Sequence, residues 1–163
     1  MKRYIIYVII IFFFIFIQST PFYENISIQD VYPDLILISF LLVALSLGPL
    51  AGEIVGFGVG FLLDILGGGL LGITSFTYTV LGYGTGLIGE KIYGRGILFP
   101  VILLFVGTIL KAIILSLLAS IFLKPGYFGF FSGGKIFLES VLNAGIAPFI
   151  FMLLSGIEKR VVD

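Results

Sequence analysis

The sequence contains no cysteine and no histidine. Their absence excludes disulfides, thiol nucleophiles and zinc sites of the usual ligand types, and it removes the commonest general base. Any catalytic chemistry would have to use carboxylates, lysine, tyrosine or serine, and no nucleophile paired with a base is recognisable. We therefore predict a protein that is not an enzyme and that holds no cofactor and no metal.

Charge is also scarce. Only 11% of the 163 residues are charged and 60% are hydrophobic, whereas soluble domains carry about a quarter charged residues. The net charge is zero, and the basic residues occur singly or in pairs, without the clusters that bind nucleic acid. The composition indicates an integral membrane protein whose surroundings are the lipid bilayer rather than nucleic acid.

The hydrophobic segments predict an all-α bundle of six transmembrane helices. These spans cover about residues 4–22, 34–48, 50–66, 72–89, 97–123 and 136–157, and about 20 apolar residues are needed to cross a bilayer. They leave no room for a soluble domain, so residues 1–163 form a single domain. The first resembles a signal peptide, but no small-residue cleavage site follows, and we expect a retained span. The second and third are short and could instead form a helical hairpin that does not fully cross.

The positions of lysine and arginine set the expected orientation, because cytoplasmic loops are enriched in them. One side would hold Lys2, Arg3, Lys91, Arg95, Lys159 and Arg160, and the other only Lys124 and Lys135. Both termini are therefore predicted to be cytoplasmic. The outer segment 124–135 is rich in aromatics and glycine, which is typical of an aromatic belt among headgroups; a flap over an outward cavity is the alternative.

Glycines recur at intervals of four through the third span and beyond. They stand at Gly48, Gly52, Gly56, Gly60, Gly68 and Gly72, and Asp64 occupies the missing position. The fourth span repeats the interval at Gly82, Gly86 and Glu90. Small residues four apart let helix backbones approach closely in lipid. The pattern predicts tight packing of the third and fourth spans on each other or on a neighbour, or binding of a partner there.

Charged residues within the spans need partners, since each costs roughly 2.5–3.5 kcal/mol near the bilayer centre. Glu53 and Asp64 share a helix face but are separated by about 16 Å along the axis, which excludes a paired acid and base. Lys111 is the basic residue at mid-depth. We expect it to pair with Asp64, or as second choice with Glu139. Such a pair would either hold the bundle together or form a polar site for a ligand or ion. Glu53 lies near the inner interface, where a solvated role is expected.

Two other groups of polar residues stand out. In the last span Pro148 predicts a helix kink, and Asn143 would satisfy a freed carbonyl or bond to another helix. The fourth span is rich in hydroxyl groups, at Thr74, Ser75, Thr77, Tyr78 and Thr79. These would bond to helix backbones or, as the alternative, line a ligand site.

Taken together, these residues resemble the MreD family of rod shape-determining membrane proteins. The likeness rests on Pro33 and Asp34 before the second span, and on Asn143 with Pro148 in the last. Its most specific part is the third-span run of Gly56, Phe57, Gly60, Asp64, Gly68 and Gly72. Glu53 and Lys111 match no motif of the family.

The resemblance implies a multi-pass scaffold of the bacterial inner membrane, part of the elongasome. Such a protein would bind the bitopic coiled-coil protein MreC. It would thereby couple MreB filaments to RodA and a penicillin-binding transpeptidase in lateral peptidoglycan synthesis; a homodimer within that complex is left open. The family is also similar in fold to the S components of energy-coupling-factor transporters. The alternative function is therefore a vitamin-type small-molecule binding subunit of a transporter.

Overall fold

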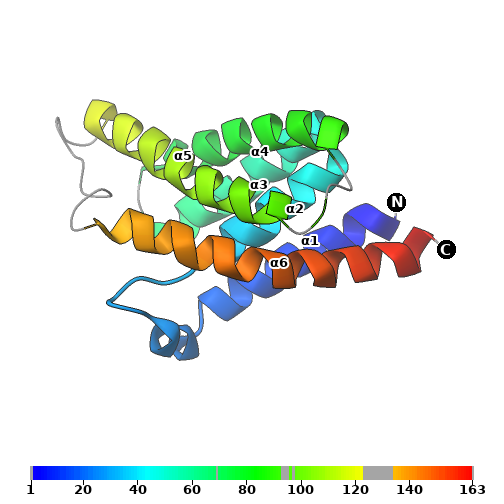
Figure 1. Cartoon of the computed structure of the whole chain (residues 1–163). Helices are drawn as coiled ribbons and strands as arrows, with labels where there is room; N and C mark the ends of the chain where they lie inside the picture. Colours follow the sequence, from blue (N-terminus) through cyan, green and yellow to red (C-terminus); the bar gives the residue numbers. More distant parts are fainter. Residues whose placement is uncertain (1, 69, 93–95, 97, 123–133, 163) are drawn as a thin grey trace.

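The computed structural model describes residues 2–68, 70–92, 96, 98–122 and 134–162, and within them the fold is all-helical (Figure 1). The elements are α1 (Lys2–Gln18), a 3-10 helix η1 (Pro21–Ile26), α2 (Leu35–Leu47), α3 (Pro49–Gly67), α4 (Ile73–Ile92), α5 (Leu98–Phe122) and α6 (Lys135–Val162). An isolated bridge between Ile28 and Val31 tightens the segment that leads into α2. The helices follow the predicted hydrophobic segments in order.

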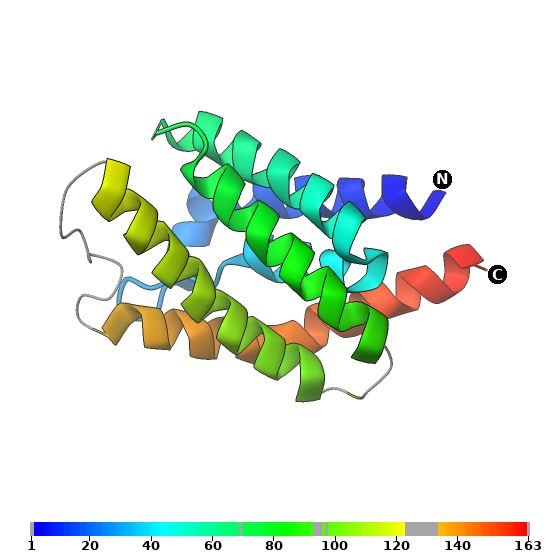
Figure 2. The ribbon, with the colours of Figure 1, turned by 90° about the horizontal axis from the view of Figure 1, so that it is seen from above.

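Successive α-helices run in opposite directions along the bundle, so both termini lie at the same end, on the right in Figures 1 and 2. The connection between α2 and α3 lies at that end too. Residues 19–34 and the turn between α3 and α4 lie at the opposite end, which we call the loop end.

Three helical segments are long and apolar enough to cross a membrane: Pro49–Gly67, Leu98–Phe122 and Lys135–Ile157. Two other apolar helices, Tyr4–Gln18 and Leu35–Leu47, are shorter. The first was predicted to continue to residue 22 but ends at Gln18. The hydroxyls of Ser19 and Thr20 donate to the carbonyls of Ile15 and Ile17, and Pro21 follows. Proline clashes with a preceding helical turn, so the helix stops there.

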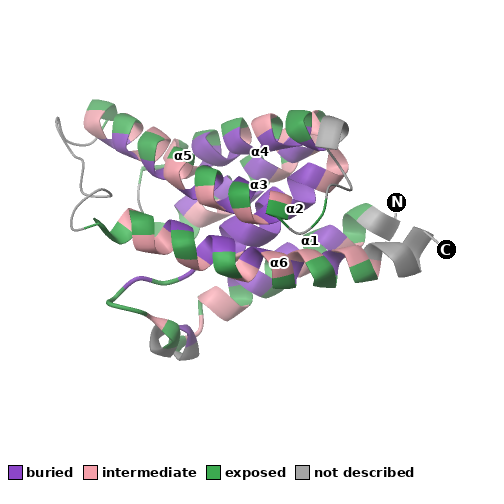
Figure 3. Ribbon diagram, in the orientation of Figure 1, coloured by how far each residue is buried: buried purple, intermediate pink, exposed green. Residues whose placement is uncertain are grey.

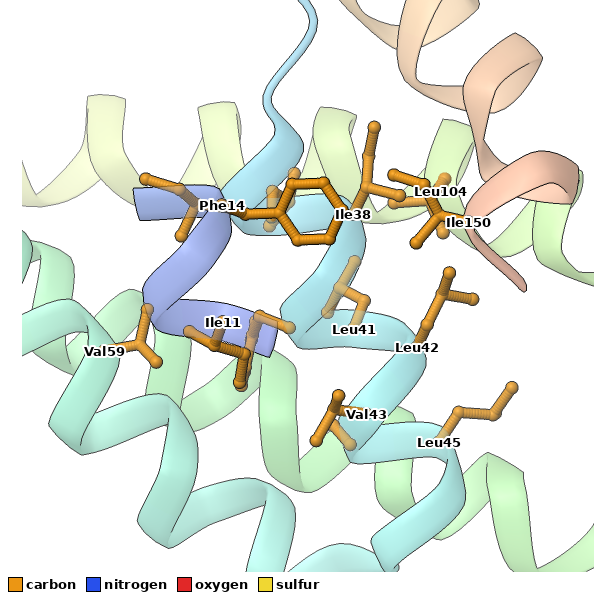
Figure 4. Close-up of a cluster of buried hydrophobic side chains, with 14 of the residues drawn as sticks. Ile11, Phe14, Ile38, Leu41, Leu42, Val43, Leu45, Val59, Leu104 and Ile150 are labelled. Carbon is orange, nitrogen blue, oxygen red and sulfur yellow. The ribbon is translucent and has the colours of Figure 1, made fainter. Parts of the chain in front are cut away.

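The helix α2 is the core of the molecule. It packs against all five other α-helices, and every residue from 36 to 45 is buried (Figure 3). Its 13 residues extend about 20 Å, less than the roughly 30 Å of a hydrocarbon core. A helix that is apolar all round is stable when other elements surround it, and here α1, α3, α5 and α6 contribute side chains such as Ile11, Val59, Leu104 and Ile150 (Figure 4). The outward faces of the surrounding helices carry large apolar side chains, as lipid contact requires.

One residue connects α2 to α3. Gly48 has φ +86°, a conformation that favours glycine, and Pro49 begins the next helix. The Gly48 N–H still donates to Ala44 and its carbonyl accepts from Gly52. The reversal is therefore tight, and it brings α3 back along α2.

Candidate functional site

The contact between α3 and α4 is made by glycines that bring the two backbones together. A Cβ atom added at Gly52 would lie 2.5 Å from the carbonyl oxygen of Gly82, and one at Gly56 would overlap the backbone of Tyr78. Real Cβ atoms do not approach other atoms so closely. No larger residue fits at these positions without separating the helices.

The same contact continues toward both ends of the helix pair. A Cβ atom at Gly60 would lie 2.5 Å from Cα of Ser75, and one at Gly86 would meet the backbone of Gly48. As residue numbers increase along α3, the contacting residue numbers decrease along α4, so the two helices are antiparallel. The close approach predicted from the interval of four is present between these two helices.

Gly68 and Gly72 do not belong to this contact, so the prediction that they pack helices of this chain is wrong; that they bind a partner stays a prediction. A Cβ atom at either would meet nothing within 4 Å. Their φ angles are +62° and +104°, in the region that glycine adopts without strain. The helix α3 ends at Gly67, so the interval of four continues into a turn, where it no longer defines a face.

Asp64 fastens that turn to the end of α3. Its Oδ2 accepts hydrogen bonds from the N–H groups of Gly72 (2.8 Å) and Ser75 (3.0 Å), and its Oδ1 accepts one from the N–H of Thr74 (3.0 Å). These N–H groups lie at the start of α4 (Ile73–Ile92), where a helix has no internal acceptors for them and where negative charge is favourable. Asp64 is buried, and it acts as the N-terminal cap of the neighbouring helix.

The predicted ion pair between Asp64 and Lys111 is therefore wrong. Asp64 belongs to α3 and Lys111 to α5, and α4 lies between these two helices (Figure 2). The depth of a charged residue in the membrane indicates whether it needs a partner. It does not indicate which helices are neighbours, so it could not identify the partner of Lys111.

Lys111 binds two other carboxylates. Its Nζ lies 2.8 Å from Oδ2 of Asp34 and 2.6 Å from Oε1 of Glu139. The three side chains are 13%, 14% and 21% exposed. Glu139, the second choice from the sequence, is one partner. Asp34 was missed as a partner because it was assigned to the outer end of the second span. The signal available was the shortness of that span, which starts well inside the bundle.

A chain of hydrogen bonds extends this triad. Asp34 caps α2, since its Oδ1 accepts from the N–H of Leu37 at 2.9 Å, and its own N–H donates to Oδ1 of Asn143 at 2.7 Å. Nδ2 of Asn143 donates to Oγ1 of Thr108 at 2.9 Å, and that hydroxyl donates to the Leu104 carbonyl. Of the two roles predicted for Asn143, the structure has the bond across to other helices. The network joins the start of α2 to the middle of α5 and the first half of α6.

Pro148 lies inside α6, which continues past it to Val162. The helix changes direction between its first and second halves (Figure 2), as expected where proline removes a backbone hydrogen bond.

Three hydroxyl groups of α4, those of Ser75, Thr77 and Thr79, donate to backbone carbonyls. Thr77 donates to Ile73 and Thr79 to Ser75, each one turn back in the same helix. The Ser75 hydroxyl donates to Phe57 of α3 at 3.1 Å. For these three residues the structure shows the first of the two predicted roles, bonding to helix backbones.

A cavity of about 370 Å³ lies beside the triad and is lined in part by residues 30–32 of the loop end. Its lining residues are Gln18, Asp30, Val31, Tyr32, Asp34, Lys111, Lys135, Ile136 and Glu139. A second cavity of about 390 Å³ shares Gln18 and Tyr32 with it. A pocket for a transport function was predicted to be lined by Asp64, Lys111 and the α4 hydroxyls. Lys111 lines the first of these cavities, whereas Asp64 and the α4 hydroxyls line neither.

Tyr23 of η1 stands near the triad. Burial raises the pKa of its phenol above the usual range, and the charge of Asp34 adds to that effect.

The family model for the rod shape-determining protein MreD matches residues 1–157. The chain belongs to the MreD family. Comparisons with curated proteins and with solved structures each gave no significant match.

The family match to residues 1–157 covers both polar clusters of this MreD-family chain, the cap made by Asp64 and the triad of Lys111, Asp34 and Glu139. Within its third-span run, Gly56 and Gly60 form the helix contact, whereas Asp64 and Gly72 form the cap and turn. Glu53 is half-buried near the start of α3, at the end that also holds the termini. Residues 124–133, for which an aromatic belt or a flap was predicted, lie outside the described residues.

Proposed function

We propose that this MreD-family protein is a non-enzymatic scaffold of the elongasome. In this role it binds MreC and, through it, couples MreB filaments to RodA and a penicillin-binding transpeptidase during lateral peptidoglycan synthesis. The observation that carries the proposal is the family match across residues 1–157. It is supported by the buried polar groups: Asp64, Lys111 and Asn143 each bind other residues of this chain.

The proposed location is the bacterial inner membrane, with both termini in the cytoplasm. The basic pairs Lys2–Arg3 and Lys159–Arg160 belong to the helix ends where the termini lie. Because cytoplasmic ends of membrane proteins are enriched in basic residues, the loop end with its cavity faces outward.

The outward faces of the bundle are suited to a partner that crosses the membrane as a single helix. On α3, Phe57 and Phe61 are exposed and stack with ring centroids 6.0 Å apart. On the opposite face of the same helix, glycines are covered by α4. The α3–α4 pair is thus a rigid unit whose apolar outer face is available to lipid or to a partner helix.

Co-purification tests the proposal. The tagged protein is isolated from membranes of a rod-shaped bacterium that depends on it, and associated proteins are identified by mass spectrometry. We expect MreC among them, and we expect depletion of the protein to turn rods into spheres. Normal rods after depletion, together with the absence of MreC, would contradict the scaffold.

The alternative is a small-molecule binding subunit of a transporter, and the cavity beside Lys111 is the observation that favours it. It predicts that a transport ATPase co-purifies and that cells lacking the protein lose uptake of one vitamin-like nutrient. Unchanged uptake with rounded cells would exclude this alternative and leave the scaffold.

A further inference from the structure

The cavity beside the triad has the properties of a binding site for a small polar molecule. Its volume of about 370 Å³ lies within the range of roughly 300–1,000 Å³ that is typical of ligand sites. Its walls come from the end of α1, the segment before α2, the middle of α5 and the first turns of α6. It is open at the loop end and closed toward the core by charged side chains.

The charges along the wall are of both signs. Three carboxylates, of Asp30, Asp34 and Glu139, face two ammonium groups, of Lys111 and Lys135. Bare metal ions suit such a wall poorly, because the fixed ammonium of Lys111 lies 2.8 and 2.6 Å from the two innermost carboxylates and repels a second cation between them. An organic molecule with separated charges is a better match.

Some of these charged groups already use their oxygens in bonds within the protein, and others can still bind a ligand. Asp34 uses one oxygen for Lys111 and the other for the N–H of Leu37. Glu139 uses Oε1 for Lys111, which leaves its second oxygen for another donor. In the part of the chain that the structure describes, no ion pair involves Asp30 or Lys135.

Two of the groups that can still bind a ligand, Lys135 and Glu139, lie on one wall of the cavity. Lys135 and Glu139 are four residues apart in α6 (Lys135–Val162), so they lie on the same helix face. Both line the cavity, Lys135 exposed and Glu139 partly buried. The Glu139 carboxylate, which can bind a positive group, therefore lies deeper in the cavity than the Lys135 ammonium, which can bind a negative group.

We propose that this cavity binds a small zwitterion that carries an ammonium group and a carboxylate, such as an amino acid or a dipeptide. The ammonium donates to the second oxygen of Glu139, and Asp30 adds negative charge at the mouth. The carboxylate of the ligand accepts from Lys135. The proposal concerns this cavity alone and does not depend on the scaffold function.

Binding of alanylalanine to the purified full-length protein in lipid nanodiscs tests the proposal. Titration calorimetry compares it with two blocked forms, N-acetyl-alanylalanine without the ammonium and alanylalanine amide without the carboxylate. We expect saturable binding of alanylalanine, at least about tenfold weaker binding of the acetylated form, and an intermediate effect for the amide.

Two variants locate the site. Glu139→Gln keeps an oxygen for Lys111 but loses the charge, and we expect about tenfold weaker binding of alanylalanine. Lys135→Gln changes an exposed residue at the mouth, so the fold is preserved; alanylalanine should bind about threefold more weakly and the amide equally well. Glu53→Gln, at the other end of the bundle, is the matched control and should bind as the unchanged protein does.

The outcomes that overturn the proposal are specific. They are the absence of alanylalanine binding to the folded protein, equal binding of the acetylated form, or binding that neither Glu139→Gln nor Lys135→Gln weakens. Each can occur while MreC still co-purifies, so failure here is distinguishable from failure of the scaffold.

Discussion

Asp64 and Asp34 solve the same structural problem in two different ways. Each is a carboxylate that caps the start of a helix in a membrane protein: Asp34 precedes α2 and accepts from Leu37, whereas Asp64 lies near the end of α3 and accepts from Thr74 and Ser75 of α4. Asp64 accepts from three backbone N–H groups and also bonds the side chain of Thr74, without a cation. Asp34 has one backbone donor and binds the ammonium of Lys111, which also binds Glu139.

The difference follows from what each site contains. Around Asp64 the turn supplies enough donors for a single negative charge, and no cation is needed. Around Asp34 a second carboxylate, Glu139, shares the site, and a buried cation between the two offsets their repulsion. A carboxylate in a membrane helix is therefore not by itself evidence for an ion pair.

The largest effect is expected where a charge would be left without its partner. Replacement of Lys111 by Met leaves Asp34 and Glu139 buried beside each other without a cation, and we expect the free energy of unfolding to fall by about 3–5 kcal/mol. Equilibrium unfolding in mixed detergent micelles, followed by circular dichroism, measures it. A second change, Glu139→Gln in the Lys111→Met background, should restore part of the loss; no restoration would contradict the triad.

The helix contact is next in magnitude. Gly56→Ala places a methyl group against the Tyr78 backbone, and we expect a loss of about 1–3 kcal/mol in the free energy of unfolding. Its matched control is Gly58→Ala in the same helix, where a Cβ meets nothing within 4 Å. Since alanine favours helix over glycine, the control should gain about 0.5–1 kcal/mol. Equal effects at the two positions would show that the contact is not there.

Asp64→Asn tests the cap that has no cation. Asparagine keeps one acceptor oxygen but turns an amide toward the N–H groups of α4, so we expect a loss of about 1–2 kcal/mol. Hydrogen exchange should be faster at the N–H groups of Gly72, Thr74 and Ser75, and unchanged in α2. Faster exchange in α2, with no change at the start of α4, would contradict the assignment of Asp64 as the cap of α4.

The smallest effect is expected at the far end of the hydrogen-bond chain. Thr108→Val preserves shape but removes the hydroxyl that accepts from Asn143, at a cost of about 1 kcal/mol. Thr79→Val, whose hydroxyl bonds only within its own helix turn, is the control and should cost less. The same unfolding assay compares them, and a larger loss for Thr79→Val would contradict the network.

The sequence predicted the parts of this structure that depend on local composition. Hydrophobic segments located the helices, and the interval of four predicted the close contact at Gly52, Gly56 and Gly60. The end of α1 was placed too late, because apolar composition continues past the residues whose hydroxyls and proline stop the helix.

The parts that depend on the lateral order of helices could not be predicted. Lys111 was assigned to Asp64 because both lie at similar depth, but α4 separates their helices (Figure 2). Asp34 was missed because its helix is surrounded on all sides and starts inside the bundle, which hydropathy does not reveal. Gly68 and Gly72 were misassigned because the spacing continues after the helix has ended.

The most direct measurement of the central claim, that Asp64 and Lys111 serve separate sites, is a double-mutant cycle. Unfolding free energies are measured for the unchanged protein, Asp64→Asn, Lys111→Met and the double variant. If the two residues serve separate sites, the losses in unfolding free energy are additive within about 0.5 kcal/mol. A coupling energy above about 1 kcal/mol, with Lys111→Met partly rescuing Asp64→Asn, would contradict it.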